Sequence, residues 1–210
     1  MRVNHTVSSL AGEDTAVQSI AVEANKDILS PLPVGTALLD GNYEGANKEA
    51  VHVLVEKAEG YAINVPPKAK EVVGIRIDAN ARVANRFQFI VGEGAELEVQ
   101  FYVTGSGDAL TNVSYLNEYD VKEAGKVVVK KVNLLPEHVQ HIEHRYTKLE
   151  EKADVEYINI EIGGSENILN YYHDLVGQES RMVHDIAYLG NKEQKFDISM
   201  LISHGGKKSF

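Results

Sequence analysis

The chain has 210 residues, a formal net charge of −10 and a pI near 5.3, and this acidic balance argues against binding to nucleic-acid phosphates. It contains no cysteine, which excludes disulfides, thiolate nucleophiles and cysteine-ligated iron–sulfur clusters on this chain. The apolar runs are too short to span a membrane and the chain does not open on a signal peptide, so we expect a cytoplasmic protein.

The first 45 residues differ in pattern from the rest. Residues 14–25 fit a short helix or a strand equally well. Residues 30–33 and 40–42 carry the proline, glycine and asparagine signals of turns and loops. We therefore predict an N-terminal extension or edge layer over residues 1–45, followed by a main domain over residues 46–210.

From residue 46 onwards, apolar and polar side chains alternate along much of the chain. The alternation covers residues 51–55, 75–77, 97–103, 158–162 and 198–202. Successive side chains of a strand point to opposite faces, so this pattern predicts strands with one buried and one wetter face. Helical spacing is rare in comparison. The sequence therefore predicts an almost all-β protein.

Similar turns precede four of these strands at similar intervals. The strand positions Leu97, Val127, Val155 and Met182 follow one another at intervals of 30, 28 and 27 residues. A loose internal period of this kind is typical of a solenoid, in which neighbouring repeats must stack because none can bury its apolar face alone. A β-sandwich or jelly roll is the alternative that the pattern leaves open.

Several segments, taken in order, resemble one protein family. They read YAINVPPKAKEVVGIRI from residue 61, FIVGEGAELEVQFYVTG from residue 89 and KADVEYINIEIGGSENILNYY from residue 152, and the likeness continues to HGGKKS near the end. In order and spacing they are similar to the SufB/SufD family of iron–sulfur cluster assembly proteins, over about residues 50–210. This resemblance implies a right-handed parallel β-helix.

The resemblance also implies a function. Members of the family form homodimers or heterodimers that dock on an ABC-type ATPase, SufC, and the complex assembles nascent iron–sulfur clusters. We therefore expect a scaffold or partner subunit that is not an enzyme by itself. It would pair with itself or with another SufB/SufD-type subunit, and it would carry at most iron or a transient cluster.

The chain departs from the family pattern in composition and at its C-terminal end. Typical members continue beyond the position of Phe210 into further coils and a helical region that contacts the ATPase. The cluster-assembly residues of the family lie mainly in that region, so none can be carried over to this chain. The lack of cysteine indicates a SufD-like partner, a minimal version or a truncated chain rather than a complete SufB-type scaffold.

Three histidines form the strongest local candidate for a metal site. His138, His141 and His144 recur at every third residue, within residues 135–145, which are ambiguous between helix and strand. On a helix the three imidazoles would lie near one face and would suit iron or zinc. On a strand, His141 would face away from the other two. A solvated polar row is the alternative.

His204 is the fourth candidate metal ligand. Together with Asp197 it matches an aspartate and histidine motif of the family. In a solenoid, His173, His184 and His204 could stack in adjacent coils and converge. A structural ladder or a dimer edge is the plainer interpretation of these residues.

Two other functions stay open from the sequence alone. A cytoplasmic β-helix carbohydrate-active enzyme would use paired carboxylates, among Glu96, Glu98, Glu156 and Glu161, and exposed tyrosines, such as Tyr171 and Tyr172. The carboxylates are more simply the wet face of strands, and the chain has no tryptophan for sugar stacking. A histidine-based metal-binding protein is the second alternative.

Overall fold

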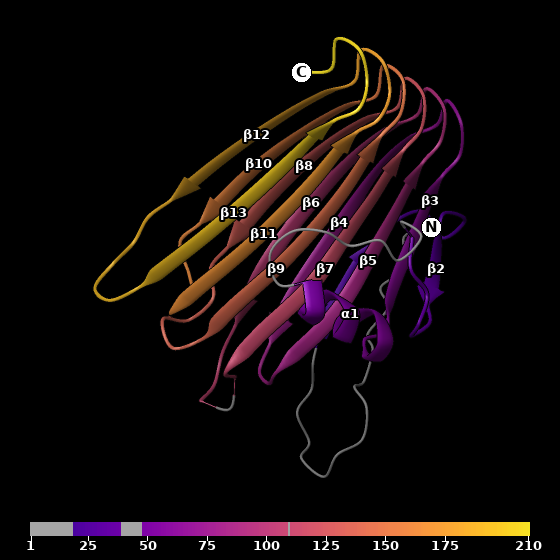
Figure 1. Cartoon of the computed structure of the whole chain (residues 1–210). Coiled ribbons are helices and arrows are strands. Elements are labelled where there is room, and N and C mark those ends of the chain that lie inside the picture. Colours follow the sequence, from indigo (N-terminus) through magenta and orange to yellow (C-terminus); the bar gives the residue numbers. More distant parts are fainter. Residues whose placement is uncertain (1–18, 39–47, 109) are drawn as a thin grey trace.

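The chain winds into a parallel β-solenoid of about five turns, in which each coil contributes one strand to each of two sheets (Figure 1). The computed structural model describes residues 19–38, 48–108 and 110–210. The prediction of an all-β parallel β-helix is confirmed. The described residues contain one helix, α1 (Lys48–Lys57), and it is neither long nor apolar enough to cross a membrane.

The strands divide between a six-stranded and a seven-stranded sheet. In spatial order, the first sheet contains β1 (Ser19–Glu23), β4 (Lys70–Ala79), β6 (Glu96–Gly105), β8 (Lys126–Asn133), β10 (Asp154–Glu161) and β12 (Arg181–Tyr188). The second sheet contains β13 (Lys195–His204), β11 (Glu166–Leu175), β9 (Gln140–Leu149), β7 (Asn112–Val121), β5 (Val83–Val91), β3 (Gly60–Val65) and β2 (Leu29–Leu32).

The internal period of the sequence is the repeat of the solenoid. Leu97 on β6 pairs with Val127 on β8, Val127 pairs with Val155 on β10, and Val155 pairs with Met182 on β12, all in parallel register. Each predicted interval therefore corresponds to one full coil. Residues in register point to the same side, so the side chains of successive coils stack in columns along the axis.

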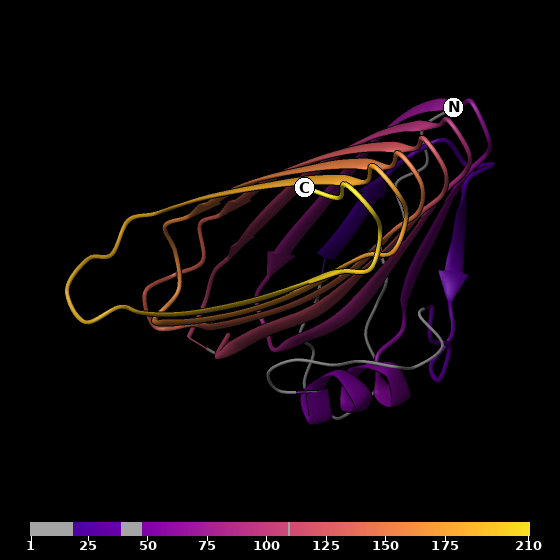
Figure 2. The same ribbon diagram turned by 45° about the horizontal axis from the view of Figure 1, so that its top comes forward.

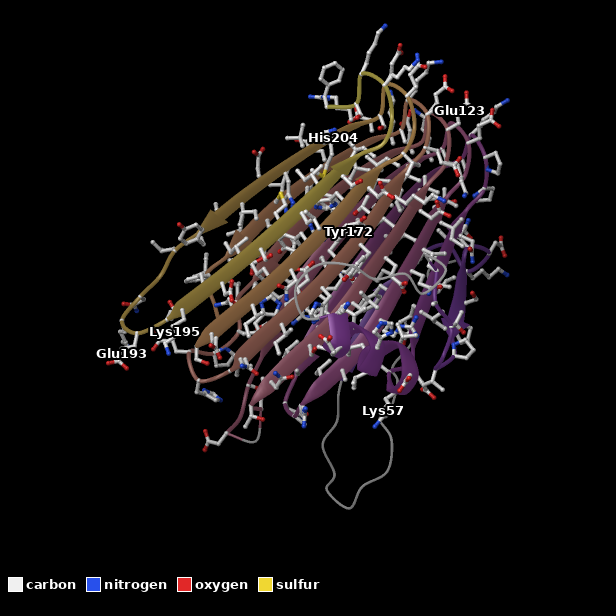
Figure 3. All side chains as sticks on the ribbon, viewed as in Figure 1. Lys57, Glu123, Tyr172, Glu193, Lys195 and His204 are labelled. Carbon is white, nitrogen blue, oxygen red and sulfur yellow. The ribbon has the colours of Figure 1, made fainter. Side chains whose placement is uncertain are left out.

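A tight turn of one shape closes each coil at one corner, where Figure 3 labels Glu123. One residue of each turn has a positive φ, between 54° and 62°. Its N–H donates to a carbonyl of the next turn along the axis, as Ala124 does to Glu151 and Lys152 does to Gln178. The stacked turns thus continue the hydrogen bonding of the sheets around the corner.

The two ends of the solenoid differ. At one end, β1 pairs antiparallel with β4, and β2 pairs antiparallel with β3. At the other end, β12 and β13 are the last strands of their sheets (Figure 2). The predicted boundary at residue 45 lies outside the described residues, so the division into residues 1–45 and 46–210 stays a prediction.

Residues 51–55 lie in helix α1, although their alternation predicted a strand, and that interpretation was wrong. The buried residues are Val51, Leu54 and Val55, whose spacing is that of one helical face. They pack against Leu116 and Tyr146, on the outer face of the seven-stranded sheet (Figure 1). The helix therefore forms because distant strands supply an apolar surface for it.

Of the two ambiguous ranges, the described part of residues 14–25 contains strand β1, and residues 135–145 contain a turn followed by the first half of β9. The part of the first range before Ser19 lies outside the described residues.

Buried polar groups attach helix α1 and the segment at Thr36 to the solenoid. Arg86 on β5 donates to the backbone carbonyls of Val55 and Thr36 and forms an ion pair with Glu118 at 3.3 Å. Gln88 donates to Glu118 at 2.9 Å and to the Thr36 carbonyl at 3.2 Å. Because the acceptors are backbone carbonyls, these contacts hold the chain at Thr36 and Val55 independently of the side chains at those two positions.

The lumen changes character along the solenoid axis. Near the antiparallel end it is filled by apolar side chains such as Phe87, Phe89 and Phe101, all of them buried. From β8 onwards, charged, amide and imidazole side chains take positions of the same inward phase. The core therefore passes from a dry apolar packing to a dry polar one.

Candidate functional site

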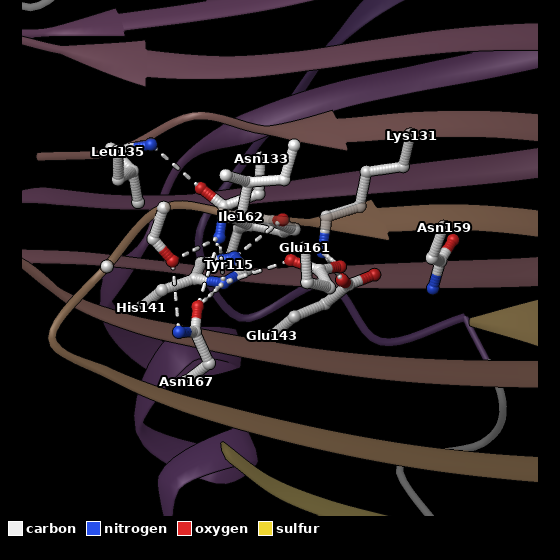
Figure 4. Close-up of polar contacts among 12 residues, drawn as sticks. Tyr115, Lys131, Asn133, Leu135, His141, Glu143, Asn159, Glu161, Ile162 and Asn167 are labelled. Carbon is white, nitrogen blue, oxygen red and sulfur yellow. Dashed lines mark hydrogen bonds and ion pairs between the residues drawn. The ribbon is translucent and has the colours of Figure 1, made fainter. Parts of the chain in front are cut away.

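Four charged side chains occupy the lumen where the apolar core ends. Lys131 on β8, Glu143 and Arg145 on β9 and Glu161 on β10 point inward, and each is at most 1% exposed (Figure 4 shows three of them). They hold positions that apolar residues hold in earlier coils. Charged residues are almost never buried to this degree unless they are paired. We call these four residues the luminal cluster.

Opposite charges are matched within the luminal cluster. Lys131 Nζ forms ion pairs with Glu143 and, at 2.5 Å, with Glu161 Oε1. Arg145 Nη2 lies 2.6 Å from Glu143 Oε1, and Arg145 Nε donates to the same oxygen at 3.1 Å. Taking an unpaired charge out of water costs several kcal/mol, so each of these charges depends on the others.

His141 connects the luminal cluster to amide side chains at the corner of the coil. Its Nε2 lies 2.9 Å from the Tyr115 hydroxyl, and its Nδ1 lies 3.0 Å from Asn133 Nδ2 and 3.1 Å from Asn167 Oδ1 (Figure 4). Glu161 approaches the same nitrogen at 3.8 Å. Both ring nitrogens therefore have polar partners, and the imidazole is held in one orientation.

Arg145 extends the polar contacts towards the last coil. Its Cζ lies 4.3 Å from the ring centroid of Tyr157 and 4.7 Å from that of Tyr171, so the guanidinium is held between two aromatic rings. Its Nη1 lies 3.5 Å from His184 Nε2 on β12. His173 packs on Tyr157, and the centroids of the two rings lie 5.4 Å apart.

The pKa values of the two carboxylates in the luminal cluster are shifted in opposite directions. Burial opposes ionisation of Glu143, but the charges of Arg145 and Lys131 outweigh it and hold its pKa below the usual range. Burial raises the pKa of Glu161, and the charge on Glu143 adds to this rise although Lys131 opposes it. Glu161 is therefore the member of the cluster that takes up a proton first.

The luminal histidines are neutral bases. Burial lowers the pKa of His141 to about 3, with a further contribution from Lys131. Burial and the nearby charge of Arg145 lower the pKa of His173 to about 3 and that of His184 to about 2. At neutral pH these imidazoles carry no charge and keep an unprotonated nitrogen.

The arrangement can take up protons and orient polar groups, but it is closed to bulk water. The chain has no cysteine, so the lumen offers no thiolate. In the part of the chain that the structure describes, no group of three or more histidine, aspartate or glutamate side chains is placed to hold a metal ion. The chemistry of the lumen is therefore that of a buried charge network rather than that of an open catalytic cleft.

The four histidines proposed as metal ligands are not brought together. Because β9 is a strand, His141 points into the lumen and His144 points away from it, as the strand alternative predicted. His138 is exposed in the turn before β9, and His204 is exposed at the end of β13. The Nδ1 atom of His204 lies 3.0 Å from Ser209 Oγ. Metal binding by any of them stays a prediction.

Two of the three histidines expected to converge from adjacent coils do so. The ring centroids of His173 on β11 and His184 on β12 lie 5.5 Å apart. Of the carboxylates considered for a carbohydrate-active site, Glu161 points into the lumen, so its expected place on the wet face was wrong, and Glu96, Glu98 and Glu156 face outward. Glu96 pairs with Lys70 at 2.8 Å, and Glu98 pairs with Lys130 at 3.0 Å.

Sequence reasoning missed the luminal cluster, although a signal for it was present. Lys131 continues the inward alternation of Val127 and Val129, and Glu161 continues that of Val155. A charge in the buried phase of a predicted strand is expensive, and a second charge in the same phase of a neighbouring coil is its natural partner.

Residues 75–210 match one protein-family model, which is described as SUF system FeS cluster assembly, SufBD core domain. This range covers well over half of the 210 residues. The chain belongs to the SufB/SufD family. Comparisons with curated proteins and with solved structures gave no match. The family resemblance that the sequence segments predicted is thereby confirmed.

Family membership assigns this SufB/SufD chain to iron–sulfur cluster assembly by the SUF system. The SufBD core domain begins within β4, so it contains the whole luminal cluster and nearly all of the parallel coils. Helix α1 and strands β1, β2 and β3 precede it. The polar lumen is thus part of the family domain, and the N-terminal layer is an addition in front of it.

Proposed function

We propose that this chain is a SufD-like partner subunit of the SUF machinery, which docks with a SufC-type ATPase in the cytoplasm and is not an enzyme by itself. The match to the SufBD core domain over residues 75–210 carries the proposal. A solenoid packed throughout its interior also suits a rigid scaffold, because each coil is fixed by its neighbours.

The composition of the chain supports the partner role. Cluster ligation and sulfur transfer in proteins use cysteine thiolates, and this chain has none. A nascent cluster would therefore take no thiolate from these 210 residues. The cluster is cargo of the complex in this proposal, and iron would meet this chain only in passing.

The unequal ends of the solenoid support pairing with a second SufB/SufD-type subunit or a second copy. The edge strands at one end are β1 and β2, which are short and antiparallel to their neighbours, whereas those at the other end are the longer, parallel β12 and β13. Unpaired edges recruit strands. The last coil also exposes apolar side chains, with Tyr188 at 61% and Met200 at 39%.

Co-purification with the SufC-type ATPase of the same source tests the proposal. The two proteins would be co-expressed and separated anaerobically by gel filtration with light scattering, with and without a SufB-type subunit. We expect one complex whose mass equals the sum of its subunits. An unrelated ABC-type ATPase is the control. A folded chain that elutes without the ATPase in every combination would contradict the proposal.

A further inference from the structure

An exposed row of apolar side chains crosses the outer face of the six-stranded sheet. Tyr102 on β6, Val132 on β8, Ile160 on β10 and Ala187 on β12 stand in register on four consecutive coils. Tyr102 and Ile160 are each 38% exposed. The row runs along the solenoid axis, at right angles to the strands.

A second apolar row lies beside the first, just past the strand ends. Leu134, Ile162 and Leu189 follow β8, β10 and β12, and they are 38%, 41% and 66% exposed. All three line one notch of about 500 Å³. The notch exists because the connection at 162–165 is shorter than those at 134–139 and 189–194 on either side of it. We call the seven residues of both rows the apolar stripe.

Charged side chains of both signs border the apolar stripe, and the acidic ones are in excess. Glu137 pairs with Lys192 at 2.6 Å, and Glu98 pairs with Lys130 at 3.0 Å. Arg76 stands in register with Tyr102 and pairs with Asp78 at 3.2 Å. In the residues that the structure describes, no ion pair is found for the exposed carboxylates of Asp185, two positions before Ala187, and of Glu193. Figure 3 labels Glu193 at the tip of the last connection. The rim of the stripe therefore has a net negative charge.

We propose that the apolar stripe binds an amphipathic, basic α-helix of a partner protein. Exposed apolar patches with polar rims mark interaction sites, and a helix lying in an apolar groove is a recurrent mode of recognition. Neighbouring coils are spaced by about 4.8 Å and the turns of a helix by about 5.4 Å, so the two repeats drift by only about 2 Å over four coils. Lysines or arginines beside the apolar face of the helix would meet the free carboxylates.

A synthetic peptide provides the probe. It would have 18 residues, leucine at positions spaced by three and four, lysine on the flanks and one tryptophan on the polar face. Because the chain itself has no tryptophan, peptide fluorescence reports binding without background. A scrambled peptide of identical composition controls for charge attraction alone. We expect the patterned peptide to bind at least fivefold more tightly than the scrambled one.

Substitutions at exposed positions separate the stripe from the rest of the sheet. Ile162→Gln and Leu189→Gln should each weaken binding of the patterned peptide at least fivefold. Val72→Gln is the matched control, because Val72 lies outside the stripe on the same face and is 53% exposed. Asp185→Asn with Glu193→Gln should reduce the loss of affinity on raising the salt concentration.

The proposal fails on any of three outcomes. Equal binding of patterned and scrambled peptides would leave only charge attraction. An equal effect of Ile162→Gln and Val72→Gln would place the binding site elsewhere. Self-association that Ile162→Gln abolishes in sedimentation would assign the stripe to a second copy of this chain. Circular dichroism of each variant checks that the fold is unchanged.

Discussion

Arg145 and Glu143, two positions apart on β9, form an ion pair inside the solenoid, with Arg145 Nη2 2.6 Å from Glu143 Oε1 and both side chains fully buried. Residues at i and i+2 of a strand share a face, so the strand itself sets this contact. Glu143 is also paired with Lys131. It is therefore the common partner of both cations in the lumen.

Removing the charge of Glu143 should be strongly destabilising. Glu143→Gln leaves Arg145 without its anion and Lys131 with Glu161 alone, and loss of one partner of a buried pair costs about 3–5 kcal/mol. Urea unfolding would measure the change in the free energy of unfolding. Glu98→Gln is the control: its pair with Lys130 lies on the outer face and should contribute less than about 1 kcal/mol. Equal effects of the two substitutions would contradict the role of the luminal cluster.

Stability should fall as the pH drops below about 6.5. Burial holds the pKa of His141 and His173 at about 3 and that of His184 at about 2, whereas histidine in an unfolded chain titrates near 6.5. The unfolded state then binds more protons, so each histidine removes about 1.4 kcal/mol of folding free energy per pH unit. Burial also lowers the pKa of His144, on the outer side of β9, to about 4, so the raised pKa of Glu161 opposes this as one group against four.

Unfolding in urea at pH 7.5, 6.5, 5.5 and 5.0 measures that dependence. His173→Phe keeps the ring packing on Tyr157 and should reduce the slope by about 1.4 kcal/mol per pH unit. His204→Gln removes an exposed imidazole and should keep the wild-type slope. A free energy of unfolding that does not change from pH 7.5 to pH 5.0 would contradict neutral histidines in the lumen.

Two glycines in strands should respond differently to alanine. A Cβ on Gly60 would lie 1.9 Å from the backbone oxygen of Arg86, so Gly60→Ala must push β3 away from β5. A Cβ on Gly74 would meet only Glu23 Cβ at 3.6 Å, an ordinary contact. We expect a loss of about 1–3 kcal/mol or more for Gly60→Ala and little change for Gly74→Ala. Thermal unfolding compares them, and similar melting temperatures would refute the register of β3.

A charge at the open end should prevent pairing of subunits. Ile202 on β13 is 37% exposed on the last coil, and lysine there would be costly to bury in an interface. We expect Ile202→Lys to convert a dimer into a monomer in sedimentation equilibrium. Val72→Lys, at a 53% exposed position of the opposite sheet, should leave the dimer intact. A dimer that survives Ile202→Lys would move the interface elsewhere.

The coil repeat could be predicted because two local features of the sequence indicate it: the alternation of apolar and polar side chains, and the regular spacing of the turns. Leu97, Val127, Val155 and Met182 each open a strand in the same phase, and parallel stacking then puts them in one rung. Parallel pairing in a solenoid needs no long-range choice of partner, since each coil meets the next along the chain. The repeat alone left a β-sandwich open, and the resemblance to the family favoured the parallel β-helix.

Helix α1 and the luminal cluster depend on contacts that local pattern does not reveal. Val53 completes the alternation that predicted a strand, yet it is 53% exposed, and the helix is held by Leu116 and Tyr146 from later coils. Alternation likewise tells which way Lys131 points but not that Glu143 will face it. Partners across coils become visible only once the register is known.

The iron and acid-labile sulfide content of the purified SUF complex tests the central claim most directly. The SufB-type subunit and the SufC-type ATPase would be co-expressed with and without this chain and purified anaerobically. A partner subunit in cluster assembly predicts that the complex containing this chain holds more iron and sulfide per SufB-type subunit, in a ratio near one to one. Equal content with and without the chain would contradict the claim.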